Sequence, residues 1–399
     1  MAWMDILLSA FKGGGPDRVP LAPGYTPGFA TGIPGDWSGA FDLTVMPAFD
    51  YGSAVHQSFL ANPIAQRAVR IVAEGIAQAP LEASHPELIA LVHATSAGQP
   101  LIETLAAHLL LHGNGFVQIA RDASGRPCEL FALRPDRVEV LVDSAGWPAA
   151  INYKVGGEAH RMPFIDEDGW PAIVQIKALH PLEDRYGAGA LAAAHQAVMI
   201  HNAASAWNRA LLENAARPSG ALVYDTGDGA GLTSDQFERL KSELATAFSG
   251  AGNAGRPMLL DGGLKWQSMA LSPADMDFAT LKSTAAREIA LAFGVPPMLL
   301  GLPGDNTYSN YREANRALWR LTLLPLASKL LGALAEALDP WFAGASLTVD
   351  LDLVPALSED RERLWSQVSA ADFLTDAEKR ELLGFPANPE PEPAQRTQP

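Results

Sequence analysis

The sequence predicts an α+β protein, and three observations support this fold class. Long segments on both sides of residues 115–177 carry apolar residues at helical spacing, whereas residues 115–177 alternate in short strand-like runs. Turn sequences such as DASGRP and DSAGW separate those runs. A length of 399 residues is sufficient for two or more structural regions.

Three helices are expected in the first half of the chain. The first covers Asn62–Gln78 and has apolar residues along one face. The second covers about Leu101–His112 and stops at Gly113, and the third runs from about Leu191 to Ala216. The runs FVQIA, ELFAL, VEVLV, INYKV and IVQIK lie between the second and third helices, so this part is expected to be β-rich.

Two further helices are expected after Gly231, separated by a short turn-rich segment with strand-like pieces. Thr233 and Gln236 form a capping-box pair at the start of the first helix. Ser272 is the expected N-cap of the second, with Pro273 at its first helical position. Each helix has a narrow apolar stripe: Phe237, Leu240, Leu244 and Phe248 on the first, and Leu281, Ala285, Ile289 and Phe293 on the second.

The loop GLPGDNTYSN, residues 301–310, precedes the longest expected helix. This helix is expected to begin near Asn310, with Glu313 completing a capping box, and to continue to about Leu338. Pro325 lies inside it, removes one backbone hydrogen bond and clashes with the preceding turn, so a kink is expected there.

The two ends of the chain differ from the middle. The first fifty residues are rich in Gly, Pro and Ser and are expected to be irregular, and the Pro-rich tail 386–399 is expected to be disordered. Before that tail, LTVDLDL from Leu347 is expected to be a strand, and Thr375 and Glu378 box the second of two short helices.

Composition excludes several classes of protein. The single cysteine, Cys128, excludes an internal disulfide framework and a cysteine-cluster metal site. The most apolar stretch, Leu321–Leu338, contains Pro325, Lys329 and Glu336, so we expect a buried or interface helix and no membrane span. The net charge of −16 argues against tight binding to DNA, because such binding depends on Lys and Arg.

Motifs for catalysis are weak. Gly187, Gly189 and Ala192 spell the G-x-G-x-x-A of a dinucleotide site, but Glu213, at the spacing of its acidic residue, lies inside the expected long helix. This pattern is the only basis for an alternative function, a nucleotide-dependent cytosolic oxidoreductase. His108 and His112 lie one helical turn apart, but no third ligand is suggested nearby, so packed or surface histidines are expected. We expect no enzyme activity, no catalytic or metal site and no cofactor.

Positive side chains are the remaining candidates for a binding site. Arg312, Arg316 and Arg320 repeat every four residues beside the loop and form one row on one helix face. Together with Lys282 and Arg287, they are expected to contact either DNA phosphates or a neighbouring subunit.

Long runs extend in matching order over nearly the whole chain after about Asn62. They include NPIAQRAVRIVAEGIAQAPL, LLLHGNGFVQIARD, LRPDRVEV, HNAASAWNRALLENAARPSG, NAGRPMLLDGGLKWQSMALSPADMDF, AAREIALAFGVPPMLLGLPGDNTYSNYREANRALWRLTLLPL and LTDAEKRELLGFP. These runs resemble the portal proteins of long-tailed phages, and most closely those of bacterial gene transfer agents. The Gly/Pro-rich arm before Asn62 departs from the resemblance.

The resemblance implies a portal fold with an α/β wing, a two-helix stem, a small β-containing clip, a long kinked helix and a helical crown. The implied order is an irregular N-terminal arm (1–50), the wing (51–231), stem helices (232–249 and 273–294) around the clip (250–272), a tunnel-loop region (295–310), the long kinked helix and a strand returning to the wing (311–354), crown helices (355–385) and a disordered tail (386–399).

The resemblance also implies a function. Family members form rings of twelve subunits at one vertex of the capsid, through which double-stranded DNA is packaged and ejected. The implied partners are further copies of the chain, double-stranded DNA without sequence specificity, the terminase large subunit, a head–tail adaptor and the major capsid protein. The implied location is a virion or phage-like particle assembled in the cytoplasm of a bacterial host. Another structural role in such a particle, as an adaptor, is a second alternative.

Site residues follow from the same resemblance. The tunnel loop, expected to face DNA, comprises Gly301, Leu302, Pro303, Gly304, Asp305, Asn306, Thr307, Tyr308, Ser309 and Asn310. The clip residues expected to dock terminase and adaptor are Asn253, Arg256, Asp261, Lys265 and Trp266.

Overall fold

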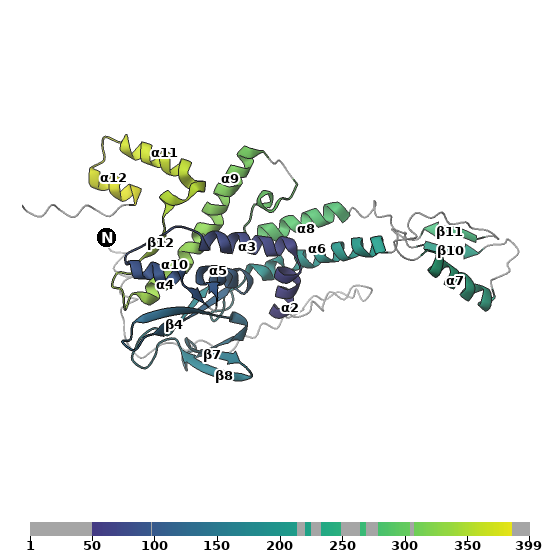
Figure 1. The fold of residues 1–399 in the computed structure, drawn as a ribbon, viewed down its shortest axis with the longest axis horizontal. Coiled ribbons are helices and arrows are strands. Elements are labelled where there is room, and N and C mark those ends of the chain that lie inside the picture. The colour runs from purple at the N-terminus through teal and green to yellow at the C-terminus, as the bar shows by residue number, and fades with distance from the viewer. Residues whose placement is uncertain are drawn as a thin grey trace, which may run out of the picture. The chain divides into compact units, whose positions relative to one another are not determined.

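The computed structural model describes residues 50–96, 98–213, 220–224, 233–248, 264–268, 278–303 and 307–384. These residues form two compact units, each made from separate chain segments. The β-rich unit contains residues 50–52, 83–189 and 329–347, and the helical unit contains the described residues of 53–82, 190–328 and 348–384. Helices and strands are both abundant (Figure 1), which confirms the predicted α+β class.

The β-rich unit contains two three-stranded antiparallel sheets, with strand orders β5-β4-β9 and β6-β7-β8. The elements are α4 (Pro86–His93), β2 (Thr95–Ser96), β3 (Gln99–Pro100), α5 (Leu101–Leu111), β4 (Asn114–Arg121), β5 (Pro127–Leu133), the 3₁₀ turn η2 (Pro135–Arg137), β6 (Val138–Val142), β7 (Pro148–Val155), β8 (Glu158–Pro163) and β9 (Ile173–Lys177). A shared apolar core joins the two sheets: Phe116, Leu133, Val138, Val140, Ile151 and Ile173. The β-rich segment expected from sequence is therefore confirmed.

Three turns in this unit have the same sequence pattern, D-x-x-G-x-P, at 122–127, 143–148 and 166–171. In each, one oxygen of the Asp side chain accepts hydrogen bonds from the backbone N–H groups two and four residues later. The glycine has positive φ in all three, which glycine adopts without steric cost. The turn sequences DASGRP and DSAGW predicted from the sequence are thus two members of a repeated motif.

The helical unit contains the helix 278–292, which packs against the helices 190–213 and 63–77. Its described elements are η1 (His56–Leu60), α3 (Pro63–Ala77), α6 (Ala190–Glu213), β10 (Gly220–Tyr224), α7 (Ser234–Phe248), β11 (Leu264–Ser268), α8 (Phe278–Ala292), η4 (Pro297–Leu300), α9 (Tyr308–Leu318), η5 (Trp319–Leu323), η6 (Leu351–Leu353), η7 (Pro355–Leu357), α11 (Ser358–Ser369) and α12 (Asp376–Leu383). Ala285, Ile289 and Phe293 of the predicted α8 stripe are buried, whereas Leu281 is exposed. Helices α6 and α8 run side by side (Figure 1).

Four elements lie where the chain passes between the units. These are α2 (Tyr51–Val55), β1 (Leu81–Ala83), α10 (Leu324–Leu338) and β12 (Leu347–Val349). Strands β1 and β12 form a two-stranded sheet. The strand expected from Leu347 ends at Val349, because Asp350 instead caps a 3₁₀ turn by accepting a hydrogen bond from the N–H of Asp352.

The buried side chain of Asn62 fixes the start of α3. Its Oδ1 accepts hydrogen bonds from the N–H groups of Ile64 and Ala65, as an N-cap does. Its Nδ2 contacts Nδ1 of His201 at 3.0 Å and donates to Oδ1 of Asn202 at 2.8 Å. One side chain therefore caps α3 and joins it to α6.

Two pairings were not expected from the sequence. Helix α8 packs along α6, whereas the resemblance implied a stem made of the helices 232–249 and 273–294. Strand β11, within the expected clip, pairs antiparallel with β10, which the sequence had placed in the wing (51–231). Both differences have one cause: helix stripes and strand patterns show that a partner is needed, but they do not identify it.

The helix that follows the loop begins earlier than expected. Thr307 is its N-cap, because the Thr307 hydroxyl accepts a hydrogen bond from the N–H of Asn310, and Tyr308–Asn310 form the first turn. The expected loop residues Tyr308, Ser309 and Asn310 are thus helical, and the expected cap at Asn310 is wrong. Thr307 and Asn310 are both residue types that cap helices well, and the structure uses Thr307.

Pro325 is accommodated by a wider turn before it. Residues Trp319–Leu323 form a π-helical turn, and the N–H of Leu324 bonds to the carbonyl of Trp319, five residues earlier. Pro325 has no N–H to offer its own turn, so this local change of hydrogen-bonding pattern lies where the sequence predicted an irregularity.

The helix 308–338 is, within the described ranges, the one long and apolar enough to cross a bilayer. Part of its apolar surface is buried, at Leu318, Leu323, Ala327, Leu330, Leu331, Leu334, Ala335 and Leu338, whereas Leu321 is 77% exposed. Packing therefore accounts for part of its hydropathy.

Two of the three expected capping boxes with described residues are confirmed. In one, Thr375 and Glu378 exchange reciprocal hydrogen bonds at the start of α12. In the other, the N–H of Thr233 donates to Gln236 Oε1 at 3.0 Å, and the N–H of Gln236 donates back to Thr233 Oγ1 at 3.4 Å. The expected N-cap Ser272, the arm 1–49 and the tail after 384 lie outside the described residues.

Candidate functional site

The first candidate site is the loop between α8 and α9. Gly301 ends the turn η4 in the left-handed region, with φ of 73°, which redirects the chain. The guanidinium group of Arg287, on α8, donates a hydrogen bond to the carbonyl of Pro303. Tyr308, at the other end of the loop, is 80% exposed. One end of the loop is therefore held by the contact with Arg287, while Gly304, Asp305 and Asn306 lie outside the described residues.

The arginine row begins directly after this loop. Arg312 and Arg316 lie one turn apart on α9, and Arg320 follows in the π turn. The Arg312 guanidinium lies over the ring of Tyr308, 5.8 Å from its centroid. This places a cation against the exposed aromatic ring at the loop end.

Every arginine of the row already has a carboxylate partner in the same chain. Arg312 Nη1 lies 2.5 Å from Glu359 Oε1, and Arg316 Nη2 lies 2.7 Å from Glu359 Oε2. Arg316 also contacts Glu313 at 3.1 Å and Asp360 at 3.5 Å, and Arg320 contacts Asp360 at 3.6 Å. We call these six residues the α9–α11 charge network: Arg312, Glu313, Arg316, Arg320, Glu359 and Asp360.

The middle of the network is sheltered from water. The Arg316 side chain is 15% exposed, compared with 48% for Arg312 and 59% for Arg320. Glu359 and Asp360 belong to the first turn of α11, where carboxylates also interact favourably with the helix dipole. Three positive and three negative groups give the network a formal charge of zero.

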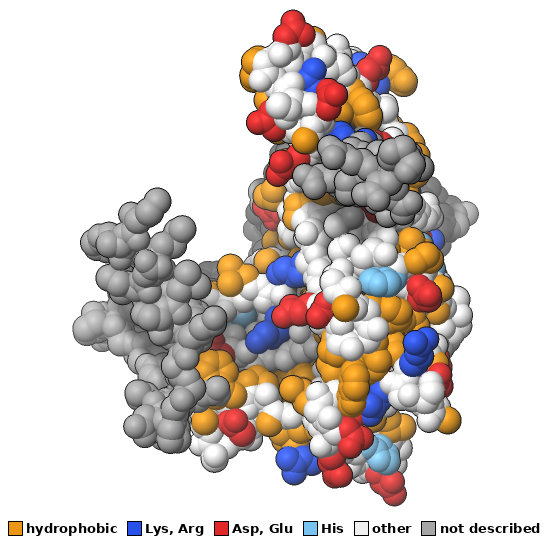
Figure 2. Space-filling model, turned by 90° about the vertical axis from the view of Figure 1, so that its left-hand side faces the viewer, with side chains coloured by type: hydrophobic (Ala, Val, Ile, Leu, Met, Phe, Trp, Pro, Cys, Tyr) orange, Lys and Arg blue, Asp and Glu red, His pale blue; other side chains and the backbone are white. Residues whose placement is uncertain are grey.

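The sequence had identified the arginines but not the acids that face them. Glu359 lies 47 residues from Arg312 and 43 residues from Arg316 along the chain. Acidic residues in a first helical turn also have an ordinary explanation, the helix dipole. The expected contacts of this row with phosphate or a neighbouring subunit stay a prediction. On the face drawn in Figure 2, Lys and Arg side chains are interspersed with Asp and Glu.

The other predicted site residues lie apart from this network in the sequence. Lys282 is half-buried on α8, and it lowers the pKa of His201 on α6 after the larger effect of burial. Lys265 and Trp266 belong to β11, opposite Val223 and Leu222 of β10. Asn253, Arg256 and Asp261 lie outside the described residues.

The glycines of the dinucleotide-like pattern have a packing role. A Cβ atom on Gly187 would lie 2.2 Å from the carbonyl oxygen of Gly113, and one on Gly189 would lie 2.6 Å from that of Leu111. The buried Asn114 side chain accepts from the Gly187 N–H at 2.8 Å and donates to its carbonyl at 3.2 Å. These contacts use the backbone that would have to approach a pyrophosphate, so they do not support a nucleotide site. We call the contact of Gly187 and Gly189 with Gly113 the glycine junction.

The histidine pair on α5 is packed rather than ligating. Burial lowers the pKa of His108 to about 4, with a smaller contribution from His112, and burial also lowers the pKa of His112. The ring of Tyr51 meets that of His112 edge-on at 4.7 Å, and burial raises the pKa of Tyr51 to about 12. No group of three metal-binding side chains occurs among the described residues.

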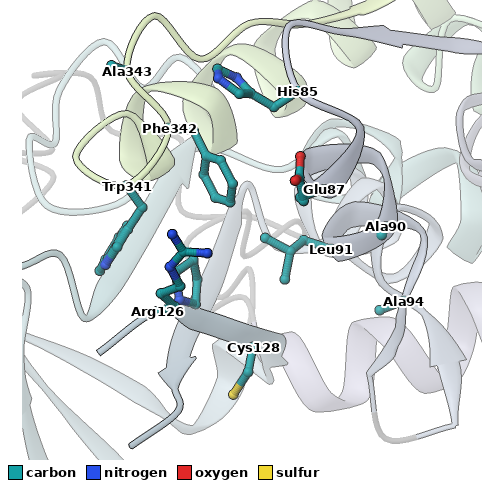
Figure 3. A pocket seen from close by; sticks show the side chains of 11 residues that line it. His85, Glu87, Ala90, Leu91, Ala94, Arg126, Cys128, Trp341, Phe342 and Ala343 are labelled. Carbon is teal, nitrogen blue, oxygen red and sulfur yellow. The ribbon is translucent and has the colours of Figure 1, made fainter. Parts of the chain in front are cut away.

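A cavity of about 530 Å³ opens on the β-rich unit (Figure 3). Leu91 and Phe342 form an apolar floor, and Glu87 and Arg126 bring opposite charges to its edge. Trp341 closes one side, stacks on Trp170 and donates from Nε1 to the Gly125 carbonyl. The lining therefore combines apolar side chains with two opposite charges.

Comparisons with known proteins agree with this description. A family model for "Phage portal protein" matches residues 63–384. A chain in the virion of a native gene transfer agent particle is 47% identical, with a TM-score of 0.65 over 86% of this chain and 96% of that chain. The neck of a native gene transfer agent particle, computed with C12 symmetry, gives the same identity and TM-score over 86% of this chain and 95% of that chain.

A phage protein is related at lower identity. The "probable portal protein" of Streptomyces phage phiC31 is 26% identical over 281 residues, which cover 66% of this chain and 60% of the phage protein. The family model extends from the first residue of α3 to the residue after α12, and so includes both units, the loop and the charge network. The chain therefore belongs to the phage portal protein family.

Proposed function

We propose that this chain is the portal subunit of a phage-like particle, the connector between head and tail. The observation that carries the proposal is the match to a neck structure computed with C12 symmetry, which extends over 86% of this chain and 95% of that chain. A ring of twelve copies at one vertex of the capsid follows from this similarity. In this role the protein is part of the particle, after assembly in the cytoplasm of a bacterial host.

The ring provides a channel for double-stranded DNA. Twelve copies with a net charge of −16 bring about −192 formal charges (12 × −16), so phosphates are repelled over much of the surface. The channel therefore admits DNA without holding it, and it reads no sequence. We assign the DNA-facing role to the loop 301–310, with its helical residues Tyr308–Asn310 at the far end.

The remaining partners follow from the same role. The clip residues Asn253, Arg256, Asp261, Lys265 and Trp266 would dock the terminase large subunit and later the head–tail adaptor. The major capsid protein would surround the ring. We propose no catalytic activity for this chain, in keeping with the structural role of its family. The glycine junction gives the oxidoreductase alternative no support.

Electron microscopy of the purified full-length protein, alone and within particles, tests the proposal. The expected result is a hollow particle with rotational symmetry. A solitary globule at all concentrations, also absent from particles made by the producing cells, would overturn it. An NAD titration is expected to show no binding.

The loop assignment needs its own measurement. Shortening the loop by removing Asp305–Thr307 is expected to change the length or the retention of packaged DNA. Normal packaging and retention in particles that carry this deletion would contradict a DNA-facing loop.

A further inference from the structure

The charge network raises a question about the arginine row beside the loop. Three arginines on successive turns of one helix are a strong phosphate-binding element when their side chains are free. In this chain each of them contacts at least one carboxylate at 3.6 Å or less. A phosphate could reach Arg316 only by displacing contacts to Glu313, Glu359 and Asp360.

The acids reach the row from a different part of the chain. Glu359 bridges Arg312 and Arg316 with its two oxygens, and Asp360 lies between Arg316 and Arg320. Two adjacent residues at the start of α11 therefore contact all three guanidinium groups. Stability alone gives a weak reason for the contacts of Arg312 and Arg320, since ion pairs at exposed side chains contribute little to it.

We propose that Glu359 and Asp360 are masking residues, which neutralise the arginine row so that DNA passing the loop is not held there. This inference rests on the proposed function, because it assigns a role to charges next to the DNA-facing loop. The masking acids position the arginines and withhold them from phosphate. DNA then moves past a surface that is rigid and electrically neutral at this point.

The test is DNA binding by a full-length variant in which both acids become neutral, Glu359→Gln with Asp360→Asn. A duplex of arbitrary sequence with a fluorescent label is titrated with protein in 50 and 200 mM NaCl. The matched control is Glu362→Gln with Glu381→Gln, which removes two charges from exposed glutamates of α11 and α12 outside the network.

The masked wild type and the control are expected to bind the duplex weakly. The unmasked variant is expected to bind more tightly at 50 mM NaCl. Its affinity is expected to be about tenfold lower at 200 mM NaCl, which is the salt dependence of a complex with about two phosphate contacts. Adding Arg316→Gln to the unmasked variant should weaken binding again, because the central cation is then absent.

Two results would overturn the masking role. One is equal DNA affinity of the wild type and the unmasked variant, with intact folding by circular dichroism. The other is an equal rise in the control, which would indicate a general effect of net charge. If the double variant does not fold, Glu359→Gln alone, which still exposes Arg312, gives the same comparison.

The test also separates this inference from the proposed function. Binding to a short duplex is measured whether or not the chain forms a ring, and ring formation is read by microscopy. If the unmasked variant binds DNA more tightly but no ring is seen by microscopy, the masking role is supported and the portal role is overturned. If a ring is seen but the wild type and the unmasked variant bind DNA equally, the portal role is supported and the masking role is overturned.

Discussion

The glycine junction of the β-rich unit and the charge network of the helical unit hold chain segments together by opposite means. At the junction, backbone meets backbone so closely that a Cβ on Gly187 would lie 2.2 Å from the Gly113 carbonyl oxygen. In the network, long side chains meet at 2.5 to 3.6 Å across half-exposed surface. The first contact depends on excluded volume and is indifferent to salt, whereas the second tolerates substitution and responds to salt.

The sharpest way to examine this contrast is Gly187→Ala, for which we expect the largest effect. The added methyl group would overlap the Gly113 carbonyl and the backbone of Ala178, neither of which is a flexible side-chain end. We expect a loss of roughly 3 kcal/mol or more in the free energy of unfolding, measured with urea.

Gly332→Ala is the control for that substitution. Gly332 lies within α10, and a Cβ there would meet nothing within 4 Å. Its replacement is expected to stabilise the helix by about 0.5–1 kcal/mol. If the Gly187→Ala variant were as stable as the wild type, the backbone at the glycine junction would be able to move and admit a methyl group. The proposed difference between the glycine junction and the charge network would then be wrong.

Asn62→Ala tests whether the helical unit also contains a contact whose contribution to stability does not depend on salt. The substitution removes the cap of α3 and the donor to Asn202, and it leaves buried polar groups without partners. We expect a loss of about 2 kcal/mol, equal in low and high salt. A salt-dependent loss, by urea unfolding at 50 and 500 mM NaCl, would contradict this expectation.

Mild acid is expected to weaken the β-rich unit. Burial holds the pKa of His108 at about 4 in the folded state, below the usual 6.5, so between these values the unfolded chain binds more protons. The stability contributed by neutral His108 is thus complete above pH 6.5 and is lost as the pH falls toward 4. The expected loss at pH 5 is about 2 kcal/mol.

Hydrogen exchange of the α5 amides at pH 7.5 and pH 5, corrected for intrinsic rates, measures this loss. His108→Gln removes the titrating group and is expected to reduce the pH dependence. The same pH dependence in that variant would assign the effect to other groups.

Salt is expected to have the smallest effect, and it should be confined to the network. Raising NaCl from 50 to 500 mM screens the exposed Arg312–Glu359 and Arg320–Asp360 pairs, so the contact between α9 and α11 should weaken by less than about 1 kcal/mol. Hydrogen exchange in α11 is expected to rise with salt while that of β4 stays constant. Equal changes in both elements would show that the two regions do not differ in this respect.

The sequence predicted best those features, such as helix starts, that depend on residues close together in the chain. The starts of α7 and α12 follow from capping pairs three residues apart, Thr233 with Gln236 and Thr375 with Glu378, whose hydrogen bonds are formed as expected. The same local logic failed at α9, because Thr307 and Asn310 are both good caps and only one can be used.

Features that depend on distant residues could not be read in the same way. The pairing of β10 with β11, of α8 with α6, and of the arginine row with Glu359 and Asp360 all join segments that local patterns treat separately. For the candidate site, sequence supplied the loop and the cations. The structure supplied the acids that change what those cations can do.

The π turn at Trp319–Leu323 also decides the direction in which the arginine row points. Each residue of an α-helix turns the chain by about 100°. One additional residue in a turn therefore rotates everything before it, relative to everything after it, by roughly that amount. Arg312 and Arg316 precede this turn and the buried leucines of α10 follow it, so deleting one uncharged residue there would turn these two arginines toward a different neighbour without altering a charge.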